Sequence, residues 1–279
     1  MLDFKLSAFA DEASSKLSEQ INAMQKHDIS LLEIRGVDGE NISKITLAKA
    51  REIKNQLKDA GIQVWSLGSP YGKIGIDDDF QPHLDQFKHG LELAYELETK
   101  HIRLFSFYKS KDKQPEEYRD EVMRRLEQFV AAAKGSNIIL CHENEKGIYG
   151  DVAKRCVEIH ETFPEIKAVF DPANFVQCKQ DTKAAWNMLS KYVEYMHIKD
   201  ALESGKVVPA GHGIGNLPFL LSQYKGTVLS LEPHLTVFKG LSELEENESR
   251  TVIPEYQYRS AGEAFDTAVD ALKMLISKD

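Results

Sequence analysis

Short apolar or β-branched runs alternate with amphipathic segments along the chain, and this alternation constrains the fold more than any other feature of the sequence. Eight runs have the length and composition of buried strands, at residues 4–9, 30–34, 63–67, 101–107, 137–141, 166–170, 194–198 and 227–231. The segments between them place apolar residues at helical spacing, as in Leu17, Ile21 and Met24. Strands that alternate with helices are typical of right-handed crossovers and a parallel sheet.

The number of units favours a closed barrel over an open sheet. Eight strand–helix units in 279 residues fit an α/β protein of the (β/α)₈ TIM-barrel class, with an open doubly wound sheet as the alternative. Helix boundaries are indicated by Gly61 after one helix, Pro115 near the start of another and Ser260 before the last. Since no Pro/Ser-rich linker divides the chain, we expect one TIM-barrel domain over residues 1–279. The acidic stretch at residues 240–258 is expected to be an exposed insertion before the last helix.

Composition limits the cellular location and the binding partners that we expect for this chain. The formal net charge of −9 would repel phosphates, so we expect no nucleic-acid partner. No basic leader and no apolar stretch of membrane-spanning length is present, which predicts a cytoplasmic protein with no membrane partner. Three cysteines, Cys141, Cys156 and Cys178, are too few and too odd in number for a disulfide framework.

Four consecutive strands are predicted to end in residues that bind metals. The fifth to the eighth runs are followed or ended by Glu143, Asp171, His197 and Glu232. In a parallel barrel these ends meet at one rim, where the active site lies. Any one of these residues taken alone is more often a helix cap or a structural residue, but four in succession favour a metal site. Three carboxylates and one imidazole suit manganese or magnesium and admit zinc.

Five short motifs also match a known family. They are EIRG at 33–36, HENE at 142–145, FDPANF at 170–175, HIKD at 197–200 and LEPH at 231–234. Through them the chain resembles the sugar phosphate isomerase/epimerase proteins of the xylose-isomerase-like TIM-barrel superfamily, over essentially its whole length. The motifs are specific for the superfamily and do not identify a substrate.

The resemblance implies a metal-dependent isomerase or epimerase of carbohydrate metabolism, acting on a sugar or sugar phosphate. One divalent ion (Mn, Mg or Zn) would be held by Glu143, Asp171, His197 and Glu232. Proton transfer α to a carbonyl would pass through an enediolate at the metal. Glu143 and Glu232 would be the catalytic acid/base pair, with Asp171 and His197 as ligands only.

Further residues at the strand ends are candidates for substrate binding: Glu33, Arg35, Lys199, Asp200, His212 and His234. A structural Glu33–Arg35 pair is an equally good interpretation. The glycines of the loop at 211–215 could bring backbone N–H groups close to an anion such as a phosphate.

Two departures from the relatives that epimerise free ketohexoses leave the reaction open. Asn174 stands where those relatives have a histidine, and no arginine lies between His197 and Gly211. A metal-dependent dehydratase of a keto-inositol or keto-sugar is therefore the main alternative, since it begins with the same proton removal. A non-catalytic sugar-binding barrel and an apurinic endonuclease are less favoured, because the ligand set is complete and the extra histidines of a three-zinc site are missing. A homo-oligomer is compatible with the sequence.

Overall fold

The eight long strands of the computed structural model form one closed barrel, in the order β1-β12-β9-β8-β7-β6-β5-β2. The model describes residues 4–236 and 256–277. All neighbouring strands are parallel, and β1 pairs with both β12 and β2, so the open sheet is excluded. In chain order the strands are β1 (Lys5–Ala8), β2 (Leu31–Ile34), β5 (Gln63–Leu67), β6 (His101–Leu104), β7 (Ile139–Glu143), β8 (Ile166–Phe170), β9 (Val193–Ile198) and β12 (Val228–Leu231).

Each predicted apolar run overlaps one of these strands, and two of the eight, β5 and β8, coincide with the prediction. β7 lies two residues later than its predicted run, and β9 begins one residue earlier. The run at 101–107 is wrong at its end, because β6 stops at Leu104. Beyond this point the N–H groups of Phe105 and Phe107 donate to the carbonyls of Tyr71 and Gly72 in the preceding loop, and not to a neighbouring strand.

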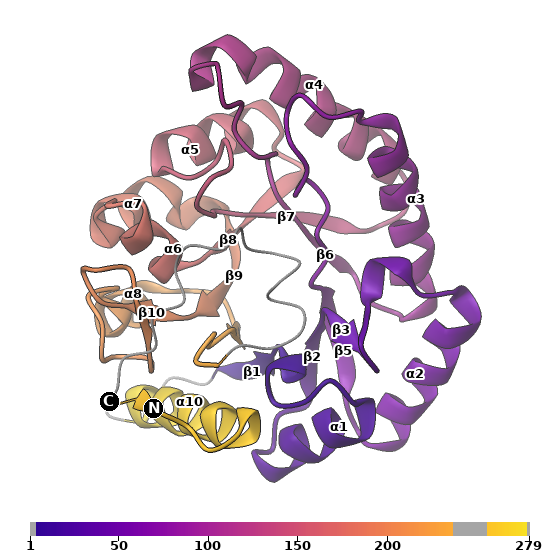
Figure 1. Cartoon of the computed structure of the whole chain (residues 1–279), viewed down its shortest axis with the longest axis vertical. Coiled ribbons are helices and arrows are strands. Elements are labelled where there is room, and N and C mark those ends of the chain that lie inside the picture. The colour runs from indigo at the N-terminus through magenta and orange to yellow at the C-terminus, as the bar shows by residue number, and fades with distance from the viewer. Residues whose placement is uncertain (1–3, 237–255, 278–279) are drawn as a thin grey trace.

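Helices form a ring around the barrel (Figure 1), as the amphipathic segments predict. They are α1 (Leu17–Lys26), α2 (Leu47–Asp59), α3 (Gln81–Glu96), α4 (Pro115–Ala133), α5 (Ala153–Thr162), α7 (Thr182–Leu189), α8 (Leu217–Gln223) and α10 (Ala261–Ile276). The predicted boundaries are confirmed: Pro115 begins α4, Gly61 follows α2 with φ +75°, and Ser260 caps α10 by accepting from the N–H of Glu263. No described helix is long and apolar enough to cross a membrane.

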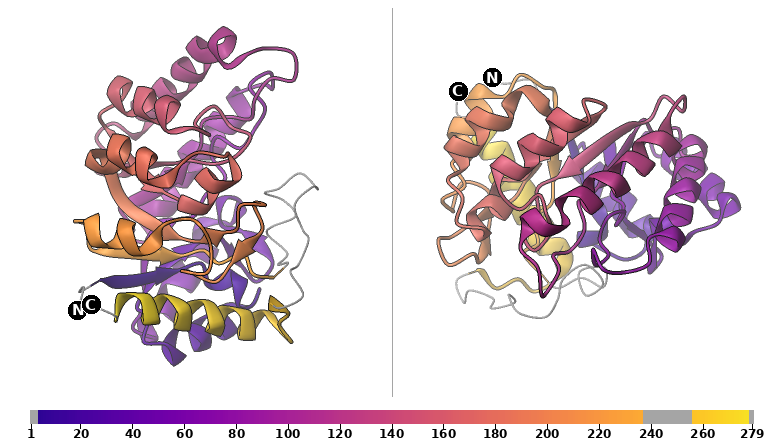
Figure 2. Two further views of the ribbon diagram at one scale, coloured as in Figure 1. Left: turned by 90° about the vertical axis from the view of Figure 1, so that its left-hand side faces the viewer. Right: turned by 90° about the horizontal axis from the view of Figure 1, so that it is seen from above.

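The last helix completes the ring beside the first. In Figures 1 and 2, α10 runs along the barrel next to β1 and α1. Asp266 of α10 forms ion pairs with Lys26 and His27 at the end of α1, each at 2.6 Å. Most of the predicted insertion at 240–258 lies outside the described residues, which resume at Tyr256.

Short elements follow the strands at their C-terminal ends and cover that end of the barrel. They are η1 (Ala10–Glu12) after β1, the hairpin of β3 (Gly36–Val37) and β4 (Glu40–Asn41) after β2, α6 (Pro172–Gln177) after β8, and the hairpin of β10 (Asp200–Ala201) and β11 (Val207–Val208) after β9. The remaining short segments are η2 (Ile42–Lys44) and η3 (Ser190–Tyr192).

The barrel interior is layered, because side chains two residues apart on a strand share a face. A lower apolar layer consists of Cys141, Val169, Tyr195 and Val228. Two residues farther along three of these strands come Glu143, Asp171 and His197, all buried. The strand alternation thus sets a polar layer directly on an apolar one, at the C-terminal end of the barrel.

Candidate metal centre

The structure brings the four predicted metal ligands together in one buried cluster. Glu143 ends β7, Asp171 follows β8, His197 lies in β9 and Glu232 follows β12. One potential ligand atom from each lies within 4.8 Å of all the others, and every side chain is at most 3% exposed. Four residues that are far apart in sequence therefore converge on one point on the barrel axis.

His197 stands between carboxylates on both sides of its ring. Its Nδ1 lies 3.1 Å from Glu143 Oε1 and 3.3 Å from Glu232 Oε2. Its Nε2 lies 3.1 Å from Oε2 of Glu33 on β2. Burial alone would lower the pKa of His197, but Glu143, Glu33 and Glu232 outweigh it and raise the pKa well above its ordinary value.

Asp171 supplies the clearest sign that the cluster suits a cation. Its Oδ1 accepts a hydrogen bond from the N–H of Asn174 at 2.9 Å, which caps α6. Its Oδ2 is buried and accepts no hydrogen bond, although Lys199 Nζ lies at 2.9 Å. The ion pair with Lys199 offsets part of the cost of burying this oxygen, and a divalent ion among these four residues would give it a further cationic partner. The donor set therefore fits a hard divalent metal.

The pKa of Asp171 reflects this unfavourable environment. Burial raises it most, Lys199 opposes the change, and the charges of Glu143 and Glu232 raise it further, to about 6. Burial also raises the pKa of Glu143, but His197 and Arg103 outweigh it, so the pKa lies below its ordinary value. For Glu232 the neighbouring Lys199 and His234 outweigh burial in the same way, and the pKa lies well below its ordinary value. Glu143 and Glu232 are thus ionised at neutral pH and able to accept a proton.

Arg103 is a central residue that our sequence analysis missed. It lies in β6, is 1% exposed, and its Nη1 donates to Glu143 Oε2 at 3.1 Å and to Glu232 Oε1 at 3.2 Å. The guanidinium therefore bridges the two glutamates. The available signal was an arginine inside a run of apolar residues, since a charge in a buried strand requires a partner; the prediction considered only the strand ends.

Lys199 lies within the same cluster. Its Nζ is 3.1 Å from Glu232 Oε2 and 2.9 Å from Asp171 Oδ2, and the residue is 3% exposed. Its predicted role in substrate binding stays a prediction; the structure places its ammonium group among the four predicted metal ligands.

Arg35 forms a second layer on the other side of Glu232. Its Nε and Nη2 each donate to Asp11 at 2.9 Å, Nη2 also donates to Glu12 at 3.1 Å, and Nη1 donates to Glu232 at 3.1 Å. His234 has φ +47°, and its Nε2 lies 3.5 Å from Glu232 Oε1. Arg35 and His234 thus lie beside the cluster, and the role in substrate binding predicted for both stays a prediction. Asp11 and Glu12 were not predicted, because the end of the first strand was not considered.

Phe9 contacts both arginines of the site. Its ring lies under the guanidinium groups of Arg35, at 4.4 Å, and Arg103, at 4.9 Å, and it packs edge-on against the imidazole of His197 at 5.3 Å. A Cβ atom at Gly68 would come within 2.5 Å of this ring. A glycine is therefore required beside Phe9.

Glu33 faces the barrel axis below the cluster. It is fully buried and accepts hydrogen bonds from Tyr195 at 2.7 Å and Ser230 at 2.6 Å, besides its contact with His197. Both carboxylate oxygens are thus occupied by this chain. A structural Glu33–Arg35 pair was one of two interpretations of the sequence, and it is not among the contacts of Arg35 described above. Glu33 contacts His197 of the cluster instead.

The glycine loop at 211–215 surrounds a carboxylate of the chain itself. The N–H groups of Gly211 and Gly213 donate to Asp200 Oδ2 at 2.9 and 3.0 Å, and that of Gly215 donates to Oδ1 at 2.9 Å. Asp200 therefore orders this loop, and the expectation that these N–H groups receive an external anion is wrong. His212, in the same loop, is exposed and its Nδ1 lies 3.1 Å from the hydroxyl of Tyr256.

Asn174, noted in the sequence analysis as a departure from the ketohexose epimerases, lies beside Glu143. Its Nδ2 donates to Glu143 Oε1 at 3.2 Å and to the carbonyl of Asn144 at 2.9 Å. Asn144 in turn donates to the carbonyl of Asp171 and accepts from its N–H, both at 2.9 Å. The two asparagines fix the relative positions of β7 and β8, and with them two of the four ligands.

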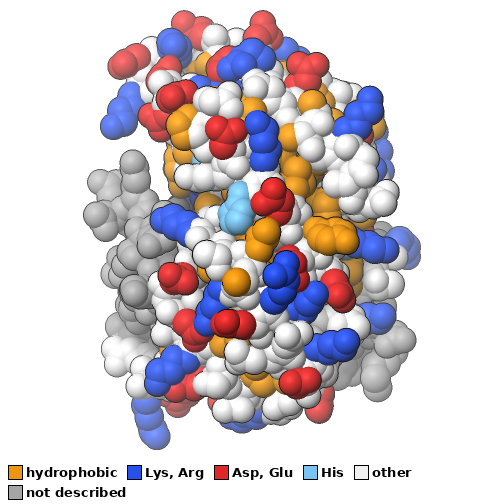
Figure 3. All heavy atoms as spheres, turned by 90° about the vertical axis from the view of Figure 1, so that its right-hand side faces the viewer, with side chains coloured by type: hydrophobic (Ala, Val, Ile, Leu, Met, Phe, Trp, Pro, Cys, Tyr) orange, Lys and Arg blue, Asp and Glu red, His pale blue; other side chains and the backbone are white. Residues whose placement is uncertain are grey.

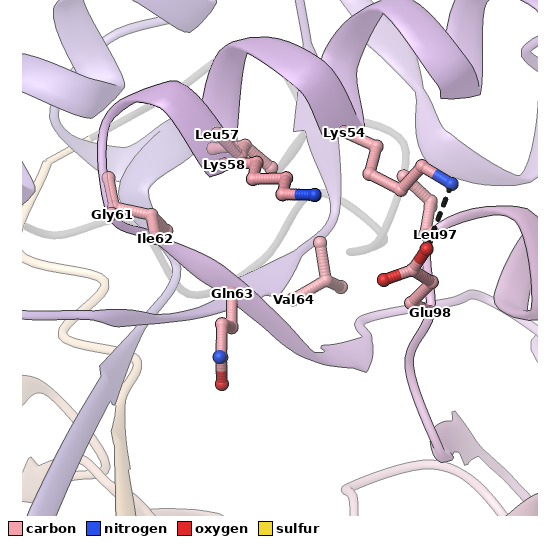
Figure 4. A pocket seen from close by; sticks show the side chains of 9 residues that line it. All are labelled: Lys54, Leu57, Lys58, Gly61, Ile62, Gln63, Val64, Leu97 and Glu98. Atoms are coloured by element: carbon pink, nitrogen blue, oxygen red, sulfur yellow. Dashed lines mark hydrogen bonds and ion pairs between the residues drawn. The ribbon is translucent and has the colours of Figure 1, made fainter.

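The other surfaces described here have no comparable cluster of buried charged residues. On the face that Figure 3 shows, acidic and basic side chains are interspersed, with no broad patch of one sign. A cavity of about 360 Å³ lies at the opposite end of the barrel, between the end of α2 and the start of β5. Lys54, Lys58 and Glu98 line it (Figure 4), and Lys54 pairs with Glu98 at 3.2 Å. Its lining contains no histidine, cysteine or serine.

Comparisons with known proteins agree with this architecture. A family model described as the xylose isomerase-like TIM barrel matches residues 21–274. No curated protein matches the chain.

Among solved structures, the IOLI protein with a bound zinc atom has a TM-score of 0.75 at 17% identity, covering 98% of each chain. The probable 3-DHS dehydratase AsbF from Bacillus anthracis has a TM-score of 0.73 at 16% identity, covering 98% of this chain and 99% of that one. A D-psicose 3-epimerase with D-tagatose from Clostridium cellulolyticum H10 has a TM-score of 0.70 at 13% identity, covering 98% of each chain. At these identities the likeness shows the fold alone.

Proposed function

The chain belongs to the xylose isomerase-like TIM-barrel family, and on this premise we propose that it is a divalent-metal-dependent isomerase or epimerase of a sugar or sugar phosphate. The single observation that carries the proposal is that two ionised glutamates, Glu143 and Glu232, contact the same two groups. These groups are the imidazole of His197 and the guanidinium of Arg103. Such a pair of glutamates at a metal site is suited to removing a proton from, or adding one to, the carbon next to a carbonyl group.

The residues that would hold the metal are Glu143, Asp171, His197 and Glu232. When bound, the ion would supply a Lewis acid that polarises a carbonyl oxygen and orients the adjacent hydroxyl. The contacts of His197 support Nδ1 as its ligand atom, because Nδ1 faces the other members of the set, whereas Nε2 faces Glu33.

Glu143 and Glu232 would act as the acid/base pair. Both carboxylates are ionised at neutral pH, so one can take the proton from the carbon next to the carbonyl. The other takes a proton from solvent and gives it to the substrate, on the opposite face of that carbon in an epimerisation or on the neighbouring carbon in an isomerisation, and the first carboxylate releases its proton to solvent. Arg103 donates to both carboxylates, and it can pair more strongly with whichever one remains charged.

Lys199 and Arg103 would also stabilise the negative charge that develops on the substrate oxygens. Both are buried and positively charged, and a fixed cation in a site from which water is excluded stabilises such charge more strongly than it would in water. Arg35 donates a further hydrogen bond to Glu232 at 3.1 Å.

Solvent-deuterium uptake tests the proposal. The metal-loaded protein is incubated in D₂O with a panel of ketoses and aldoses, free and phosphorylated, and mass spectrometry counts the deuterium gained by each. At least one compound is expected to take up deuterium, and Glu232→Gln is expected to abolish the uptake without unfolding the protein. No uptake from any compound, with metal present in the protein, would reject the proposal.

Dehydration of a keto-inositol or keto-sugar is a second candidate, favoured by Lys199. Its ammonium group lies at the cluster, 3.1 Å from Glu232, where it could protonate a departing β-hydroxyl after Glu143 or Glu232 removes the α-proton. In the same incubations a dehydratase would release a product smaller by one water, with the ultraviolet absorption of an enone or dione. An isomerase would conserve the substrate mass apart from deuterium.

A further inference from the structure

We propose that the substrate is an uncharged polyhydroxy carbonyl compound, which carries neither a phosphate nor a carboxylate. This inference rests on the proposed function and narrows its substrate class. It follows from which groups the backbone N–H donors and the positively charged side chains contact, among the described residues at the C-terminal end of the barrel.

The first observation is that the backbone N–H groups of the glycine loop at 211–215 already donate to a carboxylate of the chain. In barrels of this kind a phosphate commonly binds backbone N–H groups in the loops that follow the last strands. Here the N–H groups of Gly211, Gly213, Gly215 and Ala201 all donate to the carboxylate of Asp200, at 2.9 to 3.0 Å. Asp200 is 1% exposed, and it occupies the position that an anion would need.

The close packing of this loop leaves no room for a second anion among these donors. A Cβ atom at Gly213 would lie 2.3 Å from Asp200 Oδ1, and one at Gly215 would lie 2.6 Å from it. The glycines are therefore required for the approach to Asp200, and they do not indicate an open cradle for a ligand.

The second observation concerns three basic side chains among the described residues at this end of the barrel, those of Arg103, Lys199 and Lys73, which are paired with carboxylates of the chain. Arg103 and Lys199 both contact Glu232. In the loop after β5, Lys73 is paired at 3.2 Å with Glu145, and their side chains are 7% and 13% exposed. A phosphate would have to compete with these carboxylates for each cation.

The third observation is the balance of buried charge. Six buried carboxylates, those of Asp11, Glu12, Glu33, Glu143, Asp171 and Glu232, face three buried side chains with permanent positive charge, those of Arg35, Arg103 and Lys199. The excess of three carboxylates is larger than the two charges that a divalent ion would bring. Neutral hydroxyl and carbonyl groups can bind in this surrounding, whereas a phosphate dianion would be repelled.

Binding of matched, unreactive ligands tests the inference without turnover. Calorimetric titrations of the metal-loaded protein compare D-glucitol with D-glucitol 6-phosphate, and xylitol with xylitol 5-phosphate. These polyols lack the carbonyl group and cannot react. We expect each phosphorylated member to bind no more tightly than its parent, or not at all. Binding of a phosphorylated member at least about tenfold more tightly than its parent would overturn the inference.

A matched variant tests the role of paired charges. Glu145→Gln removes the partner of Lys73 and leaves the four cluster residues in place. We expect it to increase the affinity for the phosphorylated polyols relative to their parents by about threefold or more, while the affinity for the parents stays the same. An unchanged ratio would contradict the argument that paired cations exclude phosphate.

Failure of this inference is distinguishable from failure of the proposed function. If no sugar takes up deuterium in the exchange experiment, the proposed function is rejected, and the polyol titrations still decide whether the site accepts a phosphate. If a phosphorylated sugar exchanges faster than its free form, the proposed function stands and the inference fails.

Discussion

Replacement of Glu33 by glutamine tests how the barrel orients the histidine of the metal centre. Glu33 accepts from Tyr195 at 2.7 Å and from Ser230 at 2.6 Å, and its Oε2 lies 3.1 Å from His197 Nε2. In Glu33→Gln the carbonyl oxygen of the amide can still face His197, so the shape is kept and the negative charge is lost. Loss of such an outer-shell carboxylate typically weakens metal binding about 10- to 100-fold, or about 1.4 to 2.7 kcal/mol.

The assay is a calorimetric titration with Mn²⁺ at pH 7.5, accompanied by a denaturant unfolding curve for each protein. Tyr195→Phe is the matched control, because it removes one hydrogen bond to Glu33 and leaves the Glu33–His197 contact. It should cost about 1 kcal/mol of stability and change the Mn²⁺ affinity by less than about threefold. A folded Glu33→Gln variant that binds Mn²⁺ as tightly as the wild type would refute the proposed role of Glu33.

Three further predictions follow from the same contacts. Glu232→Gln should lower the rate of deuterium uptake about 10²- to 10⁴-fold at unchanged unfolding temperature; near-wild-type turnover would remove Glu232 from the acid/base pair. The Mn²⁺ affinity should rise with pH, because metal binding displaces protons from Asp171, whose pKa is raised to about 6, and from His197, whose pKa is raised well above its ordinary value. Each displaced proton contributes about tenfold in affinity per pH unit. Titrations from pH 5.5 to 8 that show constant affinity would contradict this prediction. Asp200→Ala should lower the free energy of unfolding by about 3 kcal/mol or more, because it leaves four N–H groups without their acceptor. Asp200→Asn keeps one acceptor oxygen and should lose less stability. Equal stability of the wild type and both variants in urea would show that the loop does not depend on Asp200.

The barrel and the four cluster residues could be predicted because both depend on local patterns. Buried parallel strands are nearly continuous apolar runs, so a polar residue at the end of each run marks the rim. Glu143, Asp171, His197 and Glu232 could be selected in this way without knowledge of any contact. Where the end of a strand depends on a loop that folds back on it, as after Leu104, the run alone gave the wrong boundary.

The surroundings of the cluster could not be predicted from such patterns, because they depend on contacts between distant segments. Arg103 is enclosed in an apolar run, and only the fold shows that it bridges two glutamates from other strands. The glycine loop at 211–215 has the composition of an anion site, yet its N–H groups bind Asp200, some 11 to 15 residues earlier in the chain. Composition thus indicated a site for an anion without showing that the chain supplies that anion itself.

The metal content of the protein tests the central claim most directly. Protein purified without chelator, then saturated with manganese and freed of excess metal, is analysed by elemental mass spectrometry, beside His197→Ala and, as a control outside the cluster, His212→Ala. The proposed site predicts about one divalent ion per chain in the wild type and in His212→Ala, and loss of that ion in His197→Ala. No bound metal in the saturated wild type, or equal metal in the folded His197→Ala variant, would contradict the assignment of these four residues as a metal centre.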